Sequence, residues 1–323
     1  MTNQTKFLYL AALLWVVLTF YFGVAFGSSG FLPCFDLIKQ SGYLFEIRIT
    51  RVLFSFLLGA GLSISGAALQ GLLRNPLVSP YTIGVSSASS LGAVIAIRLG
   101  LENLFNGYLG LFPLAVTSGI LTMFALFWLA RNKLGWSSVS ILLAGITISF
   151  FCSSAIMFVQ YTSTYRESFR MVRWLMGNIE FITQKEILVF LPFFIPSVLL
   201  LLSTGNNLNY LSLGDDTAVS SGVNIQKTTV FVFLGASLLT ATSVSMAGPV
   251  AFIGLISPHV LRLLKINNYR QLLPLSALFG GGFLVLSDLV ARTIIAPQQI
   301  PVGVITSLLG GPFFLFILLR KTN

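Results

Sequence analysis

The chain has 323 residues, of which 55% are hydrophobic and only 9% are charged, and its mean hydropathy is +0.90. Soluble globular domains carry roughly 25% charged residues, so this composition excludes a water-facing surface over most of the chain. The net charge of +10 does not indicate a nucleic-acid partner, because the basic residues lie in short segments between apolar runs, which favours contact with a phospholipid surface.

Apolar runs long enough to cross a hydrocarbon core of roughly 30 Å recur along the chain. In lipid every backbone polar group must be satisfied within its own segment, and runs that are apolar on all sides favour helices over barrel strands. We therefore expect residues 1–323 to form a single all-α transmembrane domain with about ten helices. The predicted spans are 7–26, 52–72, 82–97, 109–130, 139–158, 187–202, 229–246, 250–264, 272–294 and 302–319.

The first two spans differ in character. Span 7–26 follows one lysine and ends in a weak signal-peptidase pattern, but nine further runs follow it, so we interpret it as a retained signal anchor. Span 52–72 contains LLGAGLSISGAALQ, with Gly59, Ser63 and Ala67 at four-residue steps and Gly66 beside them. Small residues at this spacing let helices approach closely, so we predict a packing face there.

The remaining polar residues with possible chemistry are few. Cys34 and Cys152 are far apart and form no metal-spaced pair, so we expect neither a disulfide framework nor a zinc site. Span 250–264 is short and broken by Gly254 and Pro258, which predicts a position inside the bundle. The single histidine, His259, follows that proline, and we expect a structural role for it and no metal site.

The sequence lacks the common motifs for catalysis and for nucleotide binding. It contains no G-x-x-x-x-G-K-[ST] motif for nucleotide phosphates, and neither H-E-x-x-H nor G-x-S-x-G, so we expect it not to be an enzyme. An ion-coupled secondary transporter would need acidic or basic residues at mid-membrane. The only acid in a span is Asp288, four residues before Arg292, which predicts a helical ion pair near one end. Another subunit should therefore supply the energy.

The distribution of charge does not settle the orientation. An even number of spans places both termini on one side, but the predicted map divides the 19 basic residues ten to nine. Arginines on a translocated face oppose the usual bias. They indicate either a charged docking surface or local ion pairs that solvate the loops.

Four stretches resemble the FecCD family of ABC importer permeases, which includes cobalamin, ferric-siderophore and haem permeases. They are RITRVLFSFLLGAGLSISGAALQGLLRNPLVSPYTIGVS, ILLAGITIS, LSLGDDTAVSSGVNI, and a C-terminal series that begins with GPVAFIGLISPHVLRLL and ends with IPVGVITSLLGGPFF. The resemblance covers residues 48–316. It implies a cobalamin-permease-like (type II importer) fold in the bacterial cytoplasmic membrane, with both termini cytoplasmic.

The same resemblance implies the partners. They are a second permease protomer, identical or closely homologous, two ATP-binding cassette subunits that hold ATP and Mg²⁺, and an extracytoplasmic solute-binding protein. Arg48 and Arg51 of the R-x-x-R motif and Arg292 of the D-x-x-x-R motif would meet acidic residues of the binding protein. The planar guanidinium suits a bidentate carboxylate contact.

Two further groups of site residues are also implied by the resemblance. A loop at about 205–227 would form a pair of short cytoplasmic helices that contact the ATPase, with Gly222 allowing a turn between them. Its motif residues are Leu213, Gly214, Asp215, Asp216, Ala218 and Gly222. The cytoplasmic gate would be framed by Asn75, Leu77, Ser138 and Val139.

The cargo implied first is an iron chelate, namely a ferric siderophore. Cobalamin is the main alternative, because RWLMG at 173–177 resembles a W-x-M-G segment of the cobalamin permeases; haem is the third. The chain itself is expected to bind no cofactor.

Overall fold

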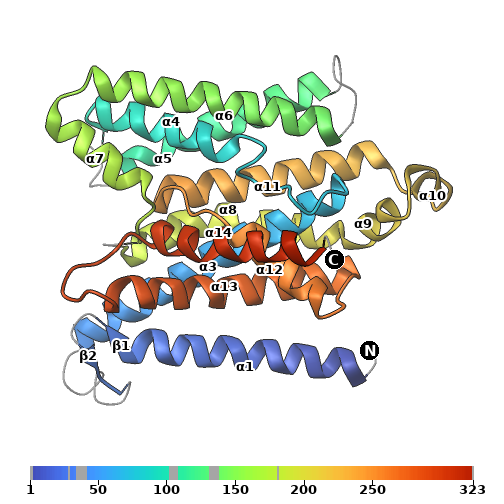
Figure 1. The fold of residues 1–323 in the computed structure, drawn as a ribbon, viewed down its shortest axis with the longest axis horizontal. Helices are drawn as coiled ribbons and strands as arrows, with labels where there is room; N and C mark the ends of the chain where they lie inside the picture. The colour runs from blue at the N-terminus through green and yellow to red at the C-terminus, as the bar shows by residue number, and fades with distance from the viewer. Residues whose placement is uncertain are drawn as a thin grey trace.

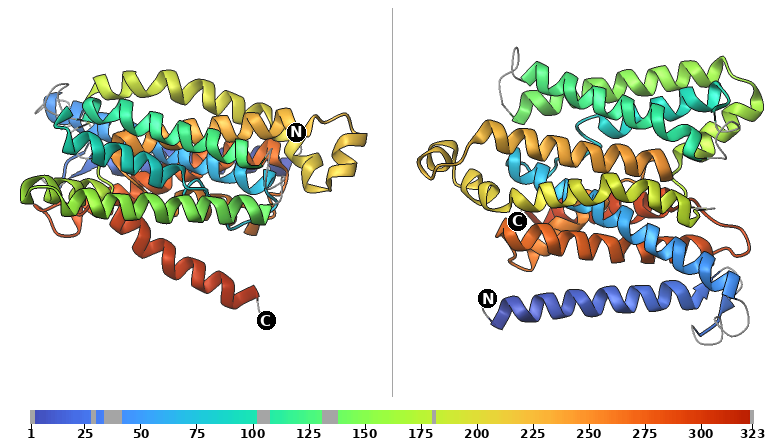
Figure 2. Two further views of the ribbon diagram at one scale, coloured as in Figure 1. Left: turned by 90° about the horizontal axis from the view of Figure 1, so that it is seen from above. Right: turned by 180° about the vertical axis from the view of Figure 1, so that it is seen from behind.

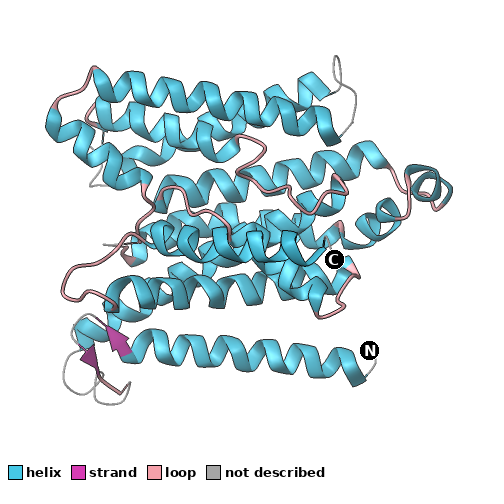
Figure 3. Cartoon of the chain, viewed as in Figure 1, coloured by secondary structure: helices cyan, strands magenta, loops and turns pink. Residues whose placement is uncertain are grey.

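The computed structural model describes residues 3–27, 30–33, 42–101, 108–130, 138–179 and 182–321. These residues are almost entirely helical (Figures 1 and 3). The long helices are α1 (Asn3–Ala25), α3 (Gly42–Leu72), α5 (Tyr108–Leu129), α6 (Ser138–Tyr161), α8 (Gln184–Ser203), α11 (Ile225–Ala247), α13 (Tyr269–Thr293) and α14 (Val302–Lys321). The shorter elements are α4 (Val85–Arg98), α7 (Tyr165–Leu175), α9 (Gly205–Ser212), α10 (Asp215–Ser220), α12 (Ile253–Leu263), β1 (Phe26–Gly27) and β2 (Gly30–Phe31).

Seven of the described helices are long and apolar enough to cross a membrane, and α4, α12 and the apolar part of α14 are shorter apolar helices. Together they correspond to the ten predicted spans. The largest difference is at the start of α3, which begins at Gly42 instead of residue 52. In the sequence, Arg48 and Arg51 interrupt the apolar run. In the structure Arg48 donates to the carbonyl oxygen of Val24 and Arg51 to the carboxylate of Asp288, so both charges have partners inside the protein and helix α3 includes both residues.

The long helix α3 lies at the centre of the bundle. Its most hydrophobic window is 83% buried, whereas that of α1 is only 17% buried. It packs against α13, α11 and α12, while α1 lies along the edge beside α13 (Figure 1). The predicted packing face of α3 is confirmed, because a Cβ added at Gly59 would meet the carbonyl oxygen of Gly280 and one at Gly66 that of Gly254.

Helix α12 also lies inside the bundle, as predicted, with Ile253, Ile256 and Leu261 buried. Its eleven residues rise only about 16 Å. It therefore covers about half of a bilayer core, and the non-helical segment 248–252 precedes it. Phe252, in the left-handed region at φ 68°, begins the helix and packs against Gly310 of α14.

The two ends of the bundle differ. Helix α7 and the small β1–β2 ladder lie at one end, and α9, α10 and both chain termini lie at the other (Figures 1 and 2). We call these the α7 end and the α10 end. The termini share one end, as an even number of spans requires.

Candidate coupling, gating and docking sites

The predicted coupling loop forms a helical hairpin, α9–α10, that extends beyond the long helices at the α10 end (Figure 1). Gly214, at φ 124° and ψ 157°, separates the two short helices, in a conformation that only glycine adopts readily. Leu213 and Val219 are 71% and 61% exposed, whereas Ala218 is fully buried. The hairpin thus presents two apolar side chains to its surroundings on a fixed base.

Gly222 does not lie between the two short helices, so that detail of the prediction is wrong. It follows α10, at φ 80°. The amide of Gly222 donates to the carbonyl oxygen of Val219, and that of Val223 donates to Ala218, both at 2.9 Å. This is a Schellman end, in which a left-handed glycine satisfies the last carbonyls of a helix.

Side-chain amides fasten the base of the hairpin to the bundle. Asn209 Nδ2 donates to Asn268 Oδ1 at 2.9 Å, and Asn209 Oδ1 accepts from the backbone amide of Tyr269 at 2.8 Å. Asn207 Nδ2 donates to Thr228 Oγ1 at 2.9 Å. The hairpin is thereby tied to the first turns of α13 and α11, and movement applied to it would be passed to both helices.

An ion pair joins the hairpin to the predicted gate loop that follows α3. Arg74 Nη2 contacts Asp215 Oδ1, and Arg74 itself is in the left-handed region at φ 48°. In the same loop Asn75 Oδ1 accepts from the amide of Leu77 at 2.9 Å, which forms a tight turn around Pro76. The structure therefore brings two of the predicted sites together, through a residue that the sequence analysis did not select.

A cavity of 330 Å³ lies between the gate loop and the hairpin, and Arg74, Asn75, Ser212 and Arg262 are among its lining residues. Arg262 Nη1 donates to Gln70 Oε1, and Gln70 Nε2 donates to the carbonyl oxygen of Gly254 at 3.1 Å. The gate loop, the hairpin and α12 thus line the same cavity. A movement of any one of them would change the shape of this cavity.

The remaining gate residues lie on the surface of the chain. Leu77 is 48% exposed and Val139, in the first turn of α6, is 64% exposed. The Ser138 side chain lies outside the described residues. Apolar side chains exposed beside a helical bundle are available to narrow a path formed with a second chain, but the gate stays a prediction.

At the α7 end, two of the three arginines predicted to dock a binding protein, Arg51 and Arg292, contact the carboxylate of Asp288. Arg51 contacts Asp288 through Nη2 at 2.8 Å and through Nε at 3.1 Å, and its Nη1 donates to Gln299 Oε1 at 2.7 Å. Arg292 Nε lies 3.5 Å from the other Asp288 oxygen. The ion pair predicted between Asp288 and Arg292 is confirmed. Arg51 forms a second ion pair with the same carboxylate.

Two of these arginines also cap the C-terminal end of α1. Arg48 Nη1 donates to the carbonyl oxygens of Val24 and Ala25, both at 3.0 Å, and Arg292 Nη2 donates to that of Gly23. The last carbonyls of a helix lack intrahelical partners and carry partial negative charge, so the guanidinium groups satisfy them and hold α1 against α3 and α13.

The same contacts bury the arginines. Arg48 is 6% exposed and Arg292 3%, and the Arg51 side chain is 13% exposed. Their docking role stays a prediction, and it requires a conformation in which the guanidinium groups are more accessible to a partner.

Helix α7 carries charged residues at the same end that the sequence analysis did not select. Arg166, Arg170 and Arg173 are exposed along it. A capping box joins Thr164 and Glu167 at its start, a pattern that is visible in the sequence as T-x-x-E. The Thr164 amide donates to Glu167 Oε2 at 2.9 Å and holds the pKa of that carboxyl below its usual range, and Arg98 acts in the same direction.

The described residues contain no group of three or more histidine, cysteine or acidic side chains that would hold a metal ion. His259 packs against the rings of Phe313 and Phe314, at centroid distances of 6.4 and 6.2 Å. Cys152 is buried, and Cys34 lies outside the described residues.

Comparisons with known proteins agree along nearly the whole chain. The FecCD transport family matches residues 11–320. The ABC transporter permease protein YvrB of Bacillus subtilis strain 168 is 42% identical over 301 residues, which are 93% of this chain and 83% of YvrB. The vitamin B12 import system permease protein BtuC of Yersinia pseudotuberculosis serotype O:1b is 34% identical over 287 residues, 87% of this chain and 84% of BtuC.

A solved structure gives the same result for the fold. It is an inward-facing conformation of a metal-chelate type ABC transporter, with a TM-score of 0.87 and 32% sequence identity, covering 98% of this chain and 99% of that one.

Proposed function

The chain belongs to the FecCD transport family, and we propose that it is the permease through which an ABC importer carries a ferric siderophore across the bacterial cytoplasmic membrane. Its fold is the cobalamin-permease-like fold of type II ABC importers. The observation that carries the proposal is the α9–α10 hairpin, which presents Leu213 and Val219 beyond the bundle. Exposed apolar side chains on a rigidly fastened hairpin are suited to burial against another subunit.

In this proposal two separate ATPase subunits bind ATP and Mg²⁺ and dock on the hairpin at the α10 end, which is cytoplasmic. Closure of the ATPase pair would displace α10, and the Arg74–Asp215 contact would transmit that movement to the gate loop. The permease would supply the path and the ATPases the energy.

At the opposite end an extracytoplasmic solute-binding protein would dock near Arg48, Arg51 and Arg292 and beside α7. The arginines at this end support the proposal, because guanidinium groups attract and orient acidic partners. A second protomer, identical or closely homologous, would complete the path.

The cargo is argued from the relatives. A metal-chelate type transporter at 32% identity supports an iron chelate. BtuC at 34% identity, together with the RWLMG segment, supports cobalamin as the second candidate. A permease that makes few specific contacts with its cargo would leave the choice to the binding protein.

Reconstitution tests both parts of the proposal. Proteoliposomes containing the permease with its ATPase and a loaded binding protein should accumulate radiolabelled ferric siderophore only when ATP is present on the α10 side. Uptake by the permease alone would refute an ATP-driven importer. Accumulation of cobalamin in place of the iron complex would refute the assigned cargo and leave the importer proposal intact.

The hairpin is tested by Leu213→Glu combined with Val219→Glu, which should abolish co-purification of the ATPase. Asn267→Glu, in the exposed loop before α13 at the same end, is the matched control and should retain it. Equal retention by both variants would show that the ATPase docks elsewhere.

A further inference from the structure

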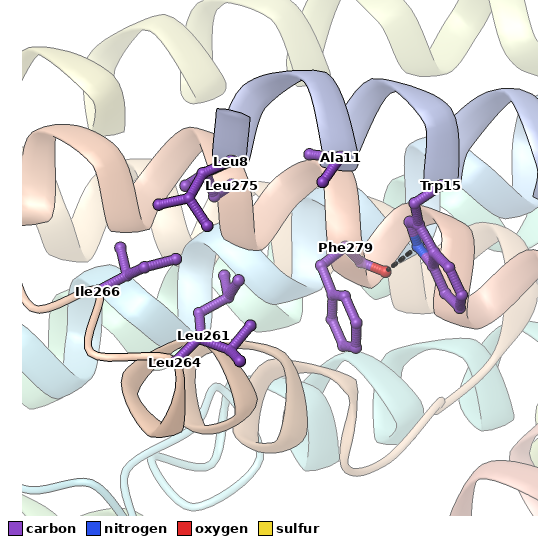
Figure 4. Close-up of a pocket in the computed structure, with 9 residues that line it drawn as sticks. Leu8, Ala11, Trp15, Leu261, Leu264, Ile266, Leu275 and Phe279 are labelled. Carbon is purple, nitrogen blue, oxygen red and sulfur yellow. Dashed lines mark hydrogen bonds between the residues drawn. The ribbon is translucent and has the colours of Figure 1, made fainter. Parts of the chain in front are cut away.

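A groove of 180 Å³ lies between the first half of α1 and the helices α12 and α13 (Figure 4). Its lining is apolar throughout. On the α1 side the lining residues are Leu8, Ala11, Ala12 and Trp15, and on the other side Leu261, Leu264, Ile266, Leu275 and Phe279. Its lining includes no residue of the α9–α10 hairpin and none of the arginines Arg48, Arg51 and Arg292.

From Trp15 onward α1 packs closely on α13, because a Cβ added at Gly282 would meet the Trp15 ring and one at Gly23 would meet Val285. The Trp15 ring stacks on Phe279 at a centroid distance of 5.5 Å, and its Nε1 donates to the Phe279 carbonyl oxygen at 3.4 Å (Figure 4). Towards the α10 end, Ala11 and Ala12 have side chains too small to fill the space opposite α12. The gap therefore follows from the sequence of α1 and not from a loose end of the helix.

The groove opens towards lipid. The neighbouring residues Leu10, Leu13 and Leu14 of α1 are 65%, 58% and 58% exposed, as expected of a helix surrounded by hydrocarbon. An apolar space of this kind is not filled by water, which needs polar partners. The seven-residue step from Leu8 to Trp15 rises about 10 Å, which gives an acyl chain a continuous apolar wall.

The open end of the groove is positively charged. Lys265 is exposed between two lining residues, Leu264 and Ile266. It occupies the left-handed position after α12 at φ 65°, where glycine would be less strained. Residues 1–35 and 217–287, which include every lining residue of the groove, contain no acidic residue.

We propose that the groove binds one anionic phospholipid from the leaflet at the α10 end. One acyl chain lies along Leu8 to Trp15, and the phosphate lies beside Lys265. The lipid fills the space between α1 and α12 and so holds the first half of α1 to the bundle. The site is independent of the transported cargo.

Quenching of Trp15 fluorescence by brominated lipid tests the site directly. The full chain would carry Phe in place of Trp128, Trp136 and Trp174, so that Trp15 is the only emitter. It would be placed in bilayers that contain small fractions of brominated phosphatidylglycerol or brominated phosphatidylcholine. One basic group near the surface predicts an about fivefold preference for the anionic lipid.

Three variants distinguish this site from general surface charge. Lys265→Gly removes the charge and suits the left-handed backbone, and should abolish the preference without loss of folded protein. Lys6→Gln, a charge at the same end that does not line the groove, should retain it. Ala12→Phe, which fills the groove, should weaken quenching by both lipids.

Equal quenching by the two lipids, or equal effects of Lys265→Gly and Lys6→Gln, would overturn the proposal. Should the single-tryptophan chain fail to fold, native mass spectrometry of the wild-type chain gives the second measurement. It should retain phosphatidylglycerol that Lys265→Gly loses, and equal retention by both chains would also overturn the site.

Discussion

Asp288 lies between two arginines and is only 1% exposed. Removing one member of a buried charge cluster leaves its partners uncompensated, which costs about 3–5 kcal/mol. The cost should be high here, because the guanidinium groups also hold the last carbonyls of α1. One carboxylate thus fixes the relative positions of three helices.

We expect Asp288→Asn to lower the midpoint of thermal unfolding markedly, with loss of the α1 contact. Thermal unfolding of the purified protein in detergent measures it. Ser287→Ala is the matched control, since Ser287 is equally buried but donates only within its own helix. Identical midpoints for the two variants would show that the cluster does not stabilise the bundle.

Arg74 and Asp215 form an exposed pair, with side chains 40% and 65% exposed. Exposed pairs contribute about 0–1 kcal/mol to stability, so this contact matters for linking the gate loop to the hairpin and not for folding. Arg74 also holds a left-handed conformation, which aspartate tolerates better than most residues.

We therefore expect Arg74→Asp to lower solute transported per ATP hydrolysed by about fivefold, the lower end of typical coupling energies, with little change in stability. Reconstituted vesicles with ATPase and binding protein measure the ratio. The exchanged pair, Arg74→Asp with Asp215→Arg, should restore it. Failure of the exchange to restore coupling would exclude the ion pair as the link.

At the scale of elements, the contact between α3 and α12 depends on Gly66. A Cβ there would meet the backbone of Gly254, which cannot move as a flexible side chain could. Overpacking of this kind costs about 1–3 kcal/mol. The position of α12 beside the gate loop therefore depends on the absence of a side chain at Gly66.

We expect Gly66→Ala to reduce the yield of monodisperse protein and to lower its unfolding temperature. Gly311→Ala is the matched control, because a Cβ at Gly311 meets nothing within 4 Å, and alanine in a helix is favoured over glycine by about 0.5–1 kcal/mol. Size-exclusion chromatography and thermal unfolding compare them. Equal behaviour would mean that α12 can shift away from α3 at no cost.

At the scale of the whole molecule, α14 projects away from the rest of the bundle (Figure 2, left). Leu308 and Leu315 on it are 66% and 63% exposed, and Phe150 and Phe151 on α6 are 70% and 71% exposed. Apolar surface of this extent must be covered by lipid or by a second chain. A second protomer on α6 and α14 agrees with the proposed importer.

We expect Leu308→Cys to give an oxidative disulfide-linked dimer in membranes. Leu121→Cys on α5 is equally exposed, at 67%, and should remain monomeric on a denaturing gel. Both variants would carry Cys34→Ser, and the native Cys152 is buried and should not react. Dimer formation by Leu121→Cys alone would place the interface on α5 and would contradict an interface on α14.

The membrane character, the ten predicted spans and the family follow from the sequence alone. Each of these depends on patterns within one segment: run length sets a span, and motif strings set the resemblance. The small-residue face of α3 and the ion pair of Asp288 with Arg292 were also predictable, because residues four apart lie on one face of a helix.

The contacts between distant segments are visible only in the folded chain. The partners of Arg51 and Arg48 lie 237 and 24 residues away, and Arg74 meets Asp215 across 141 residues. The sequence could show that these side chains are charged but not whether they are buried. Burial and pairing are properties of distant segments brought together by packing, and that packing placed the arginines inside the protein, joined the gate loop to the hairpin and left the groove beside α1.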